Sequence, residues 1–211
     1  GTDDNDVILA LEGDDTLVAS LGGDTLHGGL GRDTVTYARD FAETAVLSDE
    51  DGTAVISGSF GIDTVISVER VSFDDGLLFL DSGSGALDFT FRLYQAALGR
   101  RAEAEGLAFW VSARERGLSD RSMAVEFAAS FEFQQLLGNG ADDAAVVEAL
   151  YLNTLGRPSD QVGFDFWFDR LSSGLIDEVD LLLLFSESAE NVARTAFDTE
   201  NGVFFAGLDM I

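Results

Sequence analysis

A nine-residue repeat constrains the fold of this chain more than any other feature. Residues 1–36 divide without gaps into four nonapeptides, GTDDNDVIL, ALEGDDTLV, ASLGGDTLH and GGLGRDTVT, and residues 58–66 form a fifth, GSFGIDTVI. Position eight is Ile, Leu or Val in every copy, and position six is aspartate: Asp6, Asp15, Asp24, Asp33 and Asp63. Position four is Asp4 in the first copy and glycine afterwards: Gly13, Gly22, Gly31 and Gly61. A short fixed period of this kind is typical of a stacked, repeat-built structure.

The spacing predicts how the copies stack. An apolar residue flanked by residues of the opposite face forms a very short strand, and glycine in the preceding turn permits positive φ. Two strands then make one 18-residue turn, and successive turns lie about 4.8 Å apart. Asp6 therefore stacks with Asp24, and Asp15 with Asp33, and we expect the loop of Asp63 to stack on that of Asp24.

Stacked carboxylates repel each other unless a cation lies between them. Calcium suits such a place, because it accepts six to eight carboxylate and carbonyl oxygens in flexible geometry. We therefore expect Ca²⁺ at the loops, with ligands from this set: Asp4, Asp6, Gly13, Asp15, Gly22, Asp24, Gly31, Asp33 and Asp63. The alternative is a metal-free solenoid.

The pattern resembles the GGxGxDxUx nonapeptide of the RTX, or haemolysin-type, calcium-binding repeat. The resemblance covers about 66 residues and implies a calcium-loaded parallel β-roll. Two copies depart from it, since Ala10-Leu11 and Ala19-Ser20 replace the family's paired glycines. Carbonyl ligation at these positions survives the change, and Asp4 adds either a ligand or only charge.

Further strands are expected after the fourth copy. The 21 residues between the fourth and fifth copies hold two β-rich runs, Thr44–Ser48 and Thr53–Ser57, around an Asp-Gly turn, which predicts a hairpin. After the fifth copy, VERVSFDDGLLFLDSGSG predicts strand, Asp-Gly turn, strand and a Gly/Ser linker. We interpret this segment as a cap on the open end of the roll, because open strand edges invite aggregation. The expected first domain spans residues 1–84.

From Asp88 the hydrophobic period changes from two to 3.6, which predicts helices. Residues 93–110 align with residues 150–167 at an offset of 57, and FAASFEF (127–133) mirrors FSESAEN (185–191). Each copy predicts a helix, a Leu-Gly-Arg turn, a second helix and two shorter ones. Gly99 and Gly156 suit the positive φ of a helix end, and the expected N-caps are Ser119, Asp160 and Asp177. The expected second domain is all-helical and spans residues 85–211, which makes the fold class α+β in two domains.

The doubled Tyr-x3-Leu-Gly-Arg…Gly-x2-Phe-Trp pattern resembles DUF4214, a domain of unassigned function, and is similar to phycobilisome linker domains. The resemblance spans roughly residues 88–195. It implies a domain that often follows RTX repeats in secreted proteins of Gram-negative bacteria. Trp110 and Trp167 are expected in the core rather than in a ligand platform. Arg100 and Arg157 are expected to pair with carbonyls or carboxylates.

Composition limits the partners. The formal net charge is -27, and all 12 basic residues are arginine, so the surface repels nucleic acid and anionic membrane and attracts divalent cations. Simple solubility or adaptation to salt water would give the same balance. Absence of cysteine excludes disulfides and thiolate sites, and the longest apolar run, Leu181–Phe185, is far too short to span a membrane.

Several features concern export. No cleavable signal peptide opens the chain, and a first residue of glycine favours a fragment of a longer protein. The terminal GVFFAGLDMI resembles the uncleaved C-terminal signal of type I secretion. We expect a protein that is secreted or held at the cell surface of a Gram-negative bacterium, with the type I secretion machinery as a partner.

No catalytic constellation is predicted. His27 is the only histidine and is expected to point away from the roll interior, so no Ser-His-Asp set can be assembled. HExxH, P-loop and dinucleotide motifs are absent. The chain is therefore expected not to be an enzyme. Two functions stay open: a module for adhesion or for binding a glycan or protein, and a secretion and calcium-triggered folding module of a larger exported enzyme.

Overall fold

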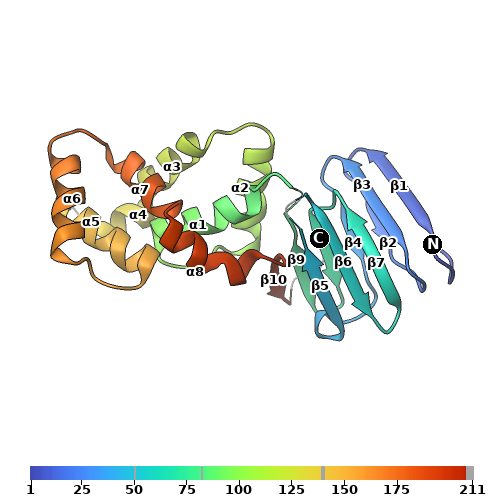
Figure 1. The fold of residues 1–211 in the computed structure, drawn as a ribbon. Helices are drawn as coiled ribbons and strands as arrows, with labels where there is room; N and C mark the ends of the chain where they lie inside the picture. Colours follow the sequence, from blue (N-terminus) through green and yellow to red (C-terminus); the bar gives the residue numbers. More distant parts are fainter. Residues whose placement is uncertain (50, 82, 139–140, 208–211) are drawn as a thin grey trace. The chain divides into compact units, whose positions relative to one another are not determined.

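The computed structural model describes residues 1–49, 51–81, 83–138 and 141–207. The chain forms two compact units: a β unit, which comprises Gly1–Leu87 and the segment from Phe197 onward, and a helical unit, Asp88–Ala196. Figure 1 shows strands in the first and helices in the second. The N-terminal part is thus β-rich, with mixed sheets, and the described part of the helical region contributes eight α-helices.

Two five-stranded sheets make up the β unit. One has the order β1-β3-β7-β6-β5 and the other β10-β9-β8-β4-β2. The strands are β1 Val7–Glu12, β2 Thr16–Val18, β3 Thr25–Leu30, β4 Thr34–Thr36, β5 Thr44–Ser48, β6 Thr53–Gly58, β7 Gly61–Ile66, β8 Arg70–Phe73, β9 Gly76–Phe79 and β10 Val203–Ala206, with a short 3-10 turn at Phe41–Glu43.

The nonapeptide strands pair in parallel with the register that the repeat predicts. Ile8 lies opposite Leu26 in one sheet and Leu17 opposite Val35 in the other, each 18 residues apart. The fifth copy continues the first stack, with Leu26 opposite Val65. Alternation places position eight inside, where Leu26 and Val35 are fully buried. The expected stacking of alternate copies is confirmed.

The segments around the repeats pair antiparallel. β5 and β6 form the expected hairpin, whose turn includes Glu50, which lies outside the described residues. β8 and β9 form the second expected hairpin. As expected of a cap, this hairpin covers the last nonapeptide strand of its sheet, since β8 pairs in parallel with β4, with Val35 opposite Val71.

The end of the chain differs from the expected division at residue 85. β10 pairs antiparallel with β9, so that Phe204 lies opposite Leu78 and the segment joins the β unit. The segment also makes an aromatic contact within the β unit: the rings of Phe41 and Phe204 stack with their centroids 4.2 Å apart. The expected secretion signal includes residues 208–211, which lie outside the described residues.

The helical unit follows the expected order of elements. Its helices are α1 Ala86–Leu98, α2 Ala104–Glu115, α3 Asp120–Ala129, α4 Phe131–Leu137, α5 Asp143–Leu150, α6 Gln161–Ser172, α7 Glu178–Ser186 and α8 Ala189–Thr199, and a π-helix, Tyr151–Leu155, extends α5. The side chains of Ser119, Asp160 and Asp177 accept N-cap hydrogen bonds as expected. Gly99 and Gly156 have φ of 64° and 67°. In the described part of the chain, no helix is long and apolar enough to cross a membrane.

The spacing between tyrosine and glycine that the two helical copies share has a steric reason. A Cβ on Gly106 would lie 2.4 Å from the hydroxyl oxygen of Tyr94, and one on Gly163 would lie 2.1 Å from that of Tyr151. Glycine therefore lets each tyrosine pack against the following helix. Both tyrosines are buried, whereas Trp110 and Trp167 are half-buried, so the tryptophans contribute to the core but keep part of their surface exposed.

Candidate metal centre

The first column of acidic residues stands on the loops of copies one, three and five. The backbone N–H of Asp6 donates to Asp24 Oδ1 at 2.9 Å, and the N–H of Asp24 donates to Asp63 Oδ1 at 2.9 Å. Each carboxylate therefore binds the backbone of the preceding turn. The structure confirms that Asp24 lies between Asp6 and Asp63.

The second column contains a member that the nonapeptide pattern does not predict. The N–H of Asp15 donates to Asp33 Oδ1 at 2.8 Å, and the N–H of Asp33 donates to Glu69 Oε2 at 2.7 Å. Glu69 follows Asp63 by six residues instead of nine, because this loop is three residues shorter. Glu69 stands two places before Val71, which is the spacing between positions six and eight of the repeat. This spacing is the signal that could have revealed it.

Glycine at position four allows the loops to approach closely. Gly31 has φ of 132°, and a Cβ there would lie 2.1 Å from the carbonyl oxygen of Gly13. The same contact recurs at Gly61, where a Cβ would lie 1.6 Å from the carbonyl oxygen of Gly22. In the first loop of the column, the carbonyl oxygen of Asp4 takes this place, 2.7 Å from where a Cβ on Gly22 would lie. The Asp4 side chain itself is exposed. This position explains why aspartate is tolerated there.

The remaining carboxylate oxygens differ between the columns. In the first column, Asp24 Oδ2 accepts from the Ser20 hydroxyl at 2.8 Å, and Asp63 Oδ2 accepts from the Tyr37 hydroxyl at 2.7 Å. In the second, Asp15 Oδ2 and Asp33 Oδ2 are buried without a hydrogen-bond partner among the described residues. A buried, unpartnered carboxylate oxygen is costly unless a cation or donor completes it.

Burial perturbs these acids. It raises the pKa of Asp33 and of Asp63 above the ordinary aspartate value, because their charged forms lose solvation. It also raises the pKa of Tyr37, whose hydroxyl is bound to Asp63. At the open first turn, hydrogen bonds from the backbone and then the hydroxyl of Thr2 lower the pKa of Asp6 instead.

The oxygens fit a calcium ion. Each loop contributes one carboxylate, and its backbone carbonyls supply further hard oxygen ligands, as calcium prefers. No group of three or more His, Asp or Glu side chains converges within the described residues, so carbonyls would have to complete any coordination shell. The carbonyls of Gly13 and Gly22, which face position four of the next turn, are candidates for this role.

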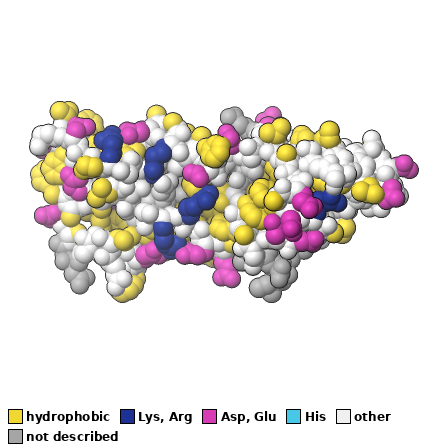
Figure 2. All heavy atoms as spheres, turned by 90° about the horizontal axis from the view of Figure 1, so that it is seen from below, with side chains coloured by type: hydrophobic (Ala, Val, Ile, Leu, Met, Phe, Trp, Pro, Cys, Tyr) yellow, Lys and Arg dark blue, Asp and Glu magenta, His cyan; other side chains and the backbone are white. Residues whose placement is uncertain are grey.

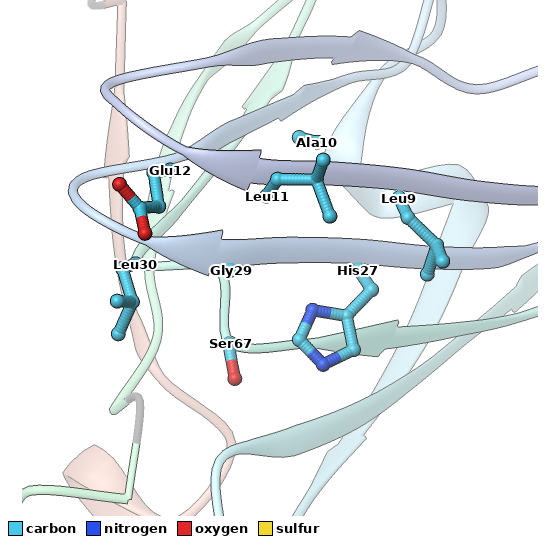
Figure 3. A pocket seen from close by; sticks show the side chains of 8 residues that line it. All are labelled: Leu9, Ala10, Leu11, Glu12, His27, Gly29, Leu30 and Ser67. Carbon is cyan, nitrogen blue, oxygen red and sulfur yellow. The ribbon is translucent and has the colours of Figure 1, made fainter.

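His27 is the remaining side chain of the β unit that the sequence analysis singled out. His27 is half-buried on the outer face of β3, as expected, and lines a shallow depression with Leu9, Leu11 and Ser67. Figure 3 shows Leu9, Leu11 and His27 on the same side of their strands. No nucleophile–base pair or carboxylate–imidazole hydrogen bond involves His27 in the part of the chain that the structure describes. Figure 2 shows carboxylates interspersed with fewer arginines on the surface, in keeping with the net charge of -27.

The chain was compared with known proteins. A family described as "RTX calcium-binding nonapeptide repeat (4 copies)" matches residues 1–35. Such repeats imply calcium binding and are typical of proteins exported by type I secretion, which indicates a secreted protein. None of the curated proteins matches the chain.

Among solved structures, the extracellular lipase LipA from Serratia marcescens is similar at a TM-score of 0.25 and 18% sequence identity, over 39% of this chain and 16% of the lipase chain. This chain thus spans a small part of that lipase's length. The "Domain of unknown function (DUF4214)" matches residues 82–136 and 124–195, more than half of the sequence. This chain therefore belongs to the DUF4214 family and carries RTX calcium-binding repeats at its N-terminal end.

Proposed function

We propose that this protein is a non-catalytic, secreted calcium-binding module whose nonapeptide copies form a β-roll around bound calcium. The observation that carries the proposal is the pair of buried, unpartnered oxygens on Asp15 and Asp33, which stack at the spacing of one turn. A cation would satisfy both oxygens and relieve the repulsion between the stacked carboxylates. In the first column Asp6, Asp24 and Asp63 stack at the same spacing, and we propose them as ligands as well, although hydroxyls already bind one oxygen of Asp24 and one of Asp63.

Calcium would also time the folding. Where free calcium is scarce, the stacked carboxylates within each column repel each other and destabilise the roll. This favours export of an unfolded chain. Where calcium is abundant, binding to the folded roll alone stabilises it by mass action. The helical unit would then be displayed outside the cell, where we propose that it acts in adhesion by binding a surface glycan or protein. Exposed aromatic rings support this role, since Phe109 and its counterpart Phe166 both lie on the surface.

Calorimetric titration of the chelator-stripped protein with calcium tests the proposal. We expect at least two ions per chain, and absence of binding by a correctly folded sample would contradict it. Asp24→Ala compared with Asp6→Ala gives the matched pair, because Asp24 stands between two turns and Asp6 contacts one. The first variant should weaken two sites and the second only one. Equal titration curves for Asp24→Ala and the parent would refute the stacked-loop ligand set.

A further inference from the structure

The two copies in the helical unit share a cluster of aromatic and charged side chains. In the second copy, the Phe185 ring lies 5.0 Å from Tyr151 and 5.5 Å from Trp167. Beside them, Arg157 pairs with Glu190. The first copy repeats this arrangement with Tyr94, Trp110, Phe127, Arg100 and Glu132. Core packing explains the buried Tyr and Phe rings, but it does not explain the half-exposed indole beside an ion pair.

The charged groups are held differently in the two copies. Arg100 donates to Glu132 at 2.6 and 2.9 Å, and its Nη1 donates to Glu103 at 2.6 Å. Arg157 binds only Glu190, at 3.2 and 3.1 Å, and its Nη1 makes no hydrogen bond within the described residues. The second copy therefore keeps an unused donor directed away from its ion pair.

The rim differs as well. Exposed Leu184 stands where the first copy has the exposed Glu126. Together with Leu155, Ser188 and the aromatic rings, Leu184 lines a depression of about 150 Å³ in the second copy. The lining thus combines apolar and aromatic side chains with a guanidinium donor and a carboxylate acceptor.

We propose that this depression, between Trp167, Leu184 and the Arg157–Glu190 pair, binds the ring of a neutral pyranoside. The inference rests on the proposed role of the helical unit in binding a surface ligand and specifies its chemistry. An indole face packs against the C–H face of a sugar ring, while neighbouring hydroxyls can accept from Arg157 and donate to Glu190. An acidic sugar fits less well, because Glu190 and the net charge of -27 repel anions.

The size of the depression limits the affinity. Its volume of about 150 Å³ suits one face of a single sugar ring rather than an enclosed ligand. It is below the range of pockets that enclose drug-sized ligands, about 300–1,000 Å³, so binding of a monosaccharide is expected to be weak. Tighter binding would require several rings or several copies of the chain.

The two tryptophans allow a direct test on the calcium-loaded full chain. Trp110→Phe leaves Trp167 as the single indole reporter, and Trp167→Phe leaves Trp110. Methyl glycosides of glucose, galactose and mannose are titrated, with sorbitol as the non-ring control. A saturable change in fluorescence with at least one glycoside is expected for Trp110→Phe and not for Trp167→Phe. Absence of a change in Trp110→Phe with every glycoside, or a response in Trp167→Phe, overturns the proposal.

Surface variants guard against a folding defect. In the Trp110→Phe background, Arg157→Lys should weaken glycoside binding about tenfold, whereas Arg100→Lys should leave it unchanged. Leu184→Glu, which copies the rim of the first half, should abolish binding, whereas Glu126→Leu should not. Equal affinities within both pairs overturn the site. Undiminished attachment of the Leu184→Glu chain to surface glycans would leave the proposed function standing while the site fails. Absence of all such attachment by the parent chain, together with absence of calcium binding, would refute the proposed function itself.

Discussion

In the β unit, neighbouring copies touch through the same groups at every step, a carboxylate on one turn and a backbone N–H on the previous turn. In the helical unit, two copies of a much longer segment each build their own aromatic cluster and their own arginine ion pair. The first arrangement concentrates negative charge along two columns, whereas the second neutralises its arginines locally. Stability of the β unit should therefore depend on a cation supplied from outside, and stability of the helical unit should not.

Removal of calcium is expected to separate the two units most strongly. At a free concentration of 100 times Kd, each site would stabilise the folded β unit by about 2.7 kcal/mol, so the loss of two or more sites approaches the whole stability of a small domain. Chelation should unfold the strands of the β unit and spare α2 to α7. Hydrogen exchange with peptide resolution measures both units in one sample. Simultaneous loss of protection in the helices would show that the units unfold as one.

Alanine at position four of the repeat should distinguish stacked loops from the open first loop of the second column. Gly31→Ala forces a Cβ against the Gly13 carbonyl, whereas Gly13→Ala meets only the Asp15 carboxylate, at 3.8 Å. Both residues have positive φ, so each change costs about 1–2 kcal/mol. Gly31→Ala should cost a further ~1–3 kcal/mol for the clash. Thermal melting in saturating calcium compares them, and equal melting temperatures would contradict the close stacking.

In the helical unit, a substitution that usually stabilises a helix should do the opposite. Gly→Ala within a helix normally gains up to about 1 kcal/mol, and Gly163 lies in the first turn of α6. Gly163→Ala places its Cβ against the Tyr151 hydroxyl and should instead destabilise by about 1–2 kcal/mol. Urea unfolding followed by tryptophan fluorescence gives the value.

The matched control for this substitution removes the hydroxyl. Gly163→Ala combined with Tyr151→Phe should recover part of the loss, because the two groups contact each other and their effects are coupled. If the double variant loses as much stability as the sum of the single ones, the contact does not explain the glycine.

The smallest effect is expected at the two arginines. Arg100 pairs with two carboxylates and Arg157 with one, and both side chains are more than a third exposed, so solvent screens the pairs. Arg100→Gln should cost up to about 1 kcal/mol and Arg157→Gln about half as much or less. The difference should shrink as salt is raised. A larger loss for Arg157→Gln in urea unfolding would reverse this ranking of the two copies.

Periodicity alone determined much of the protein. A period of nine with aspartate at position six is sufficient to predict which carboxylates stack, since the strand register follows from the alternation of inward and outward residues. The helix N-caps at Ser119, Asp160 and Asp177 were also predictable, because capping is a local contact within three residues.

Contacts between distant segments were decided by the tertiary structure. Glu69 joins the second column only because a shortened loop still delivers β8 onto β4, and no periodic pattern marks it. β10 joins β9 across more than 120 residues of sequence. Likewise, the Asn153 amide reaches the carbonyls of Ala96 and Ala97 through a π-helix that has no counterpart in the first copy. Each of these contacts depends on where a separate part of the chain lies in space, and a local window, even one with a hint such as the acid two places before Val71, does not fix that position.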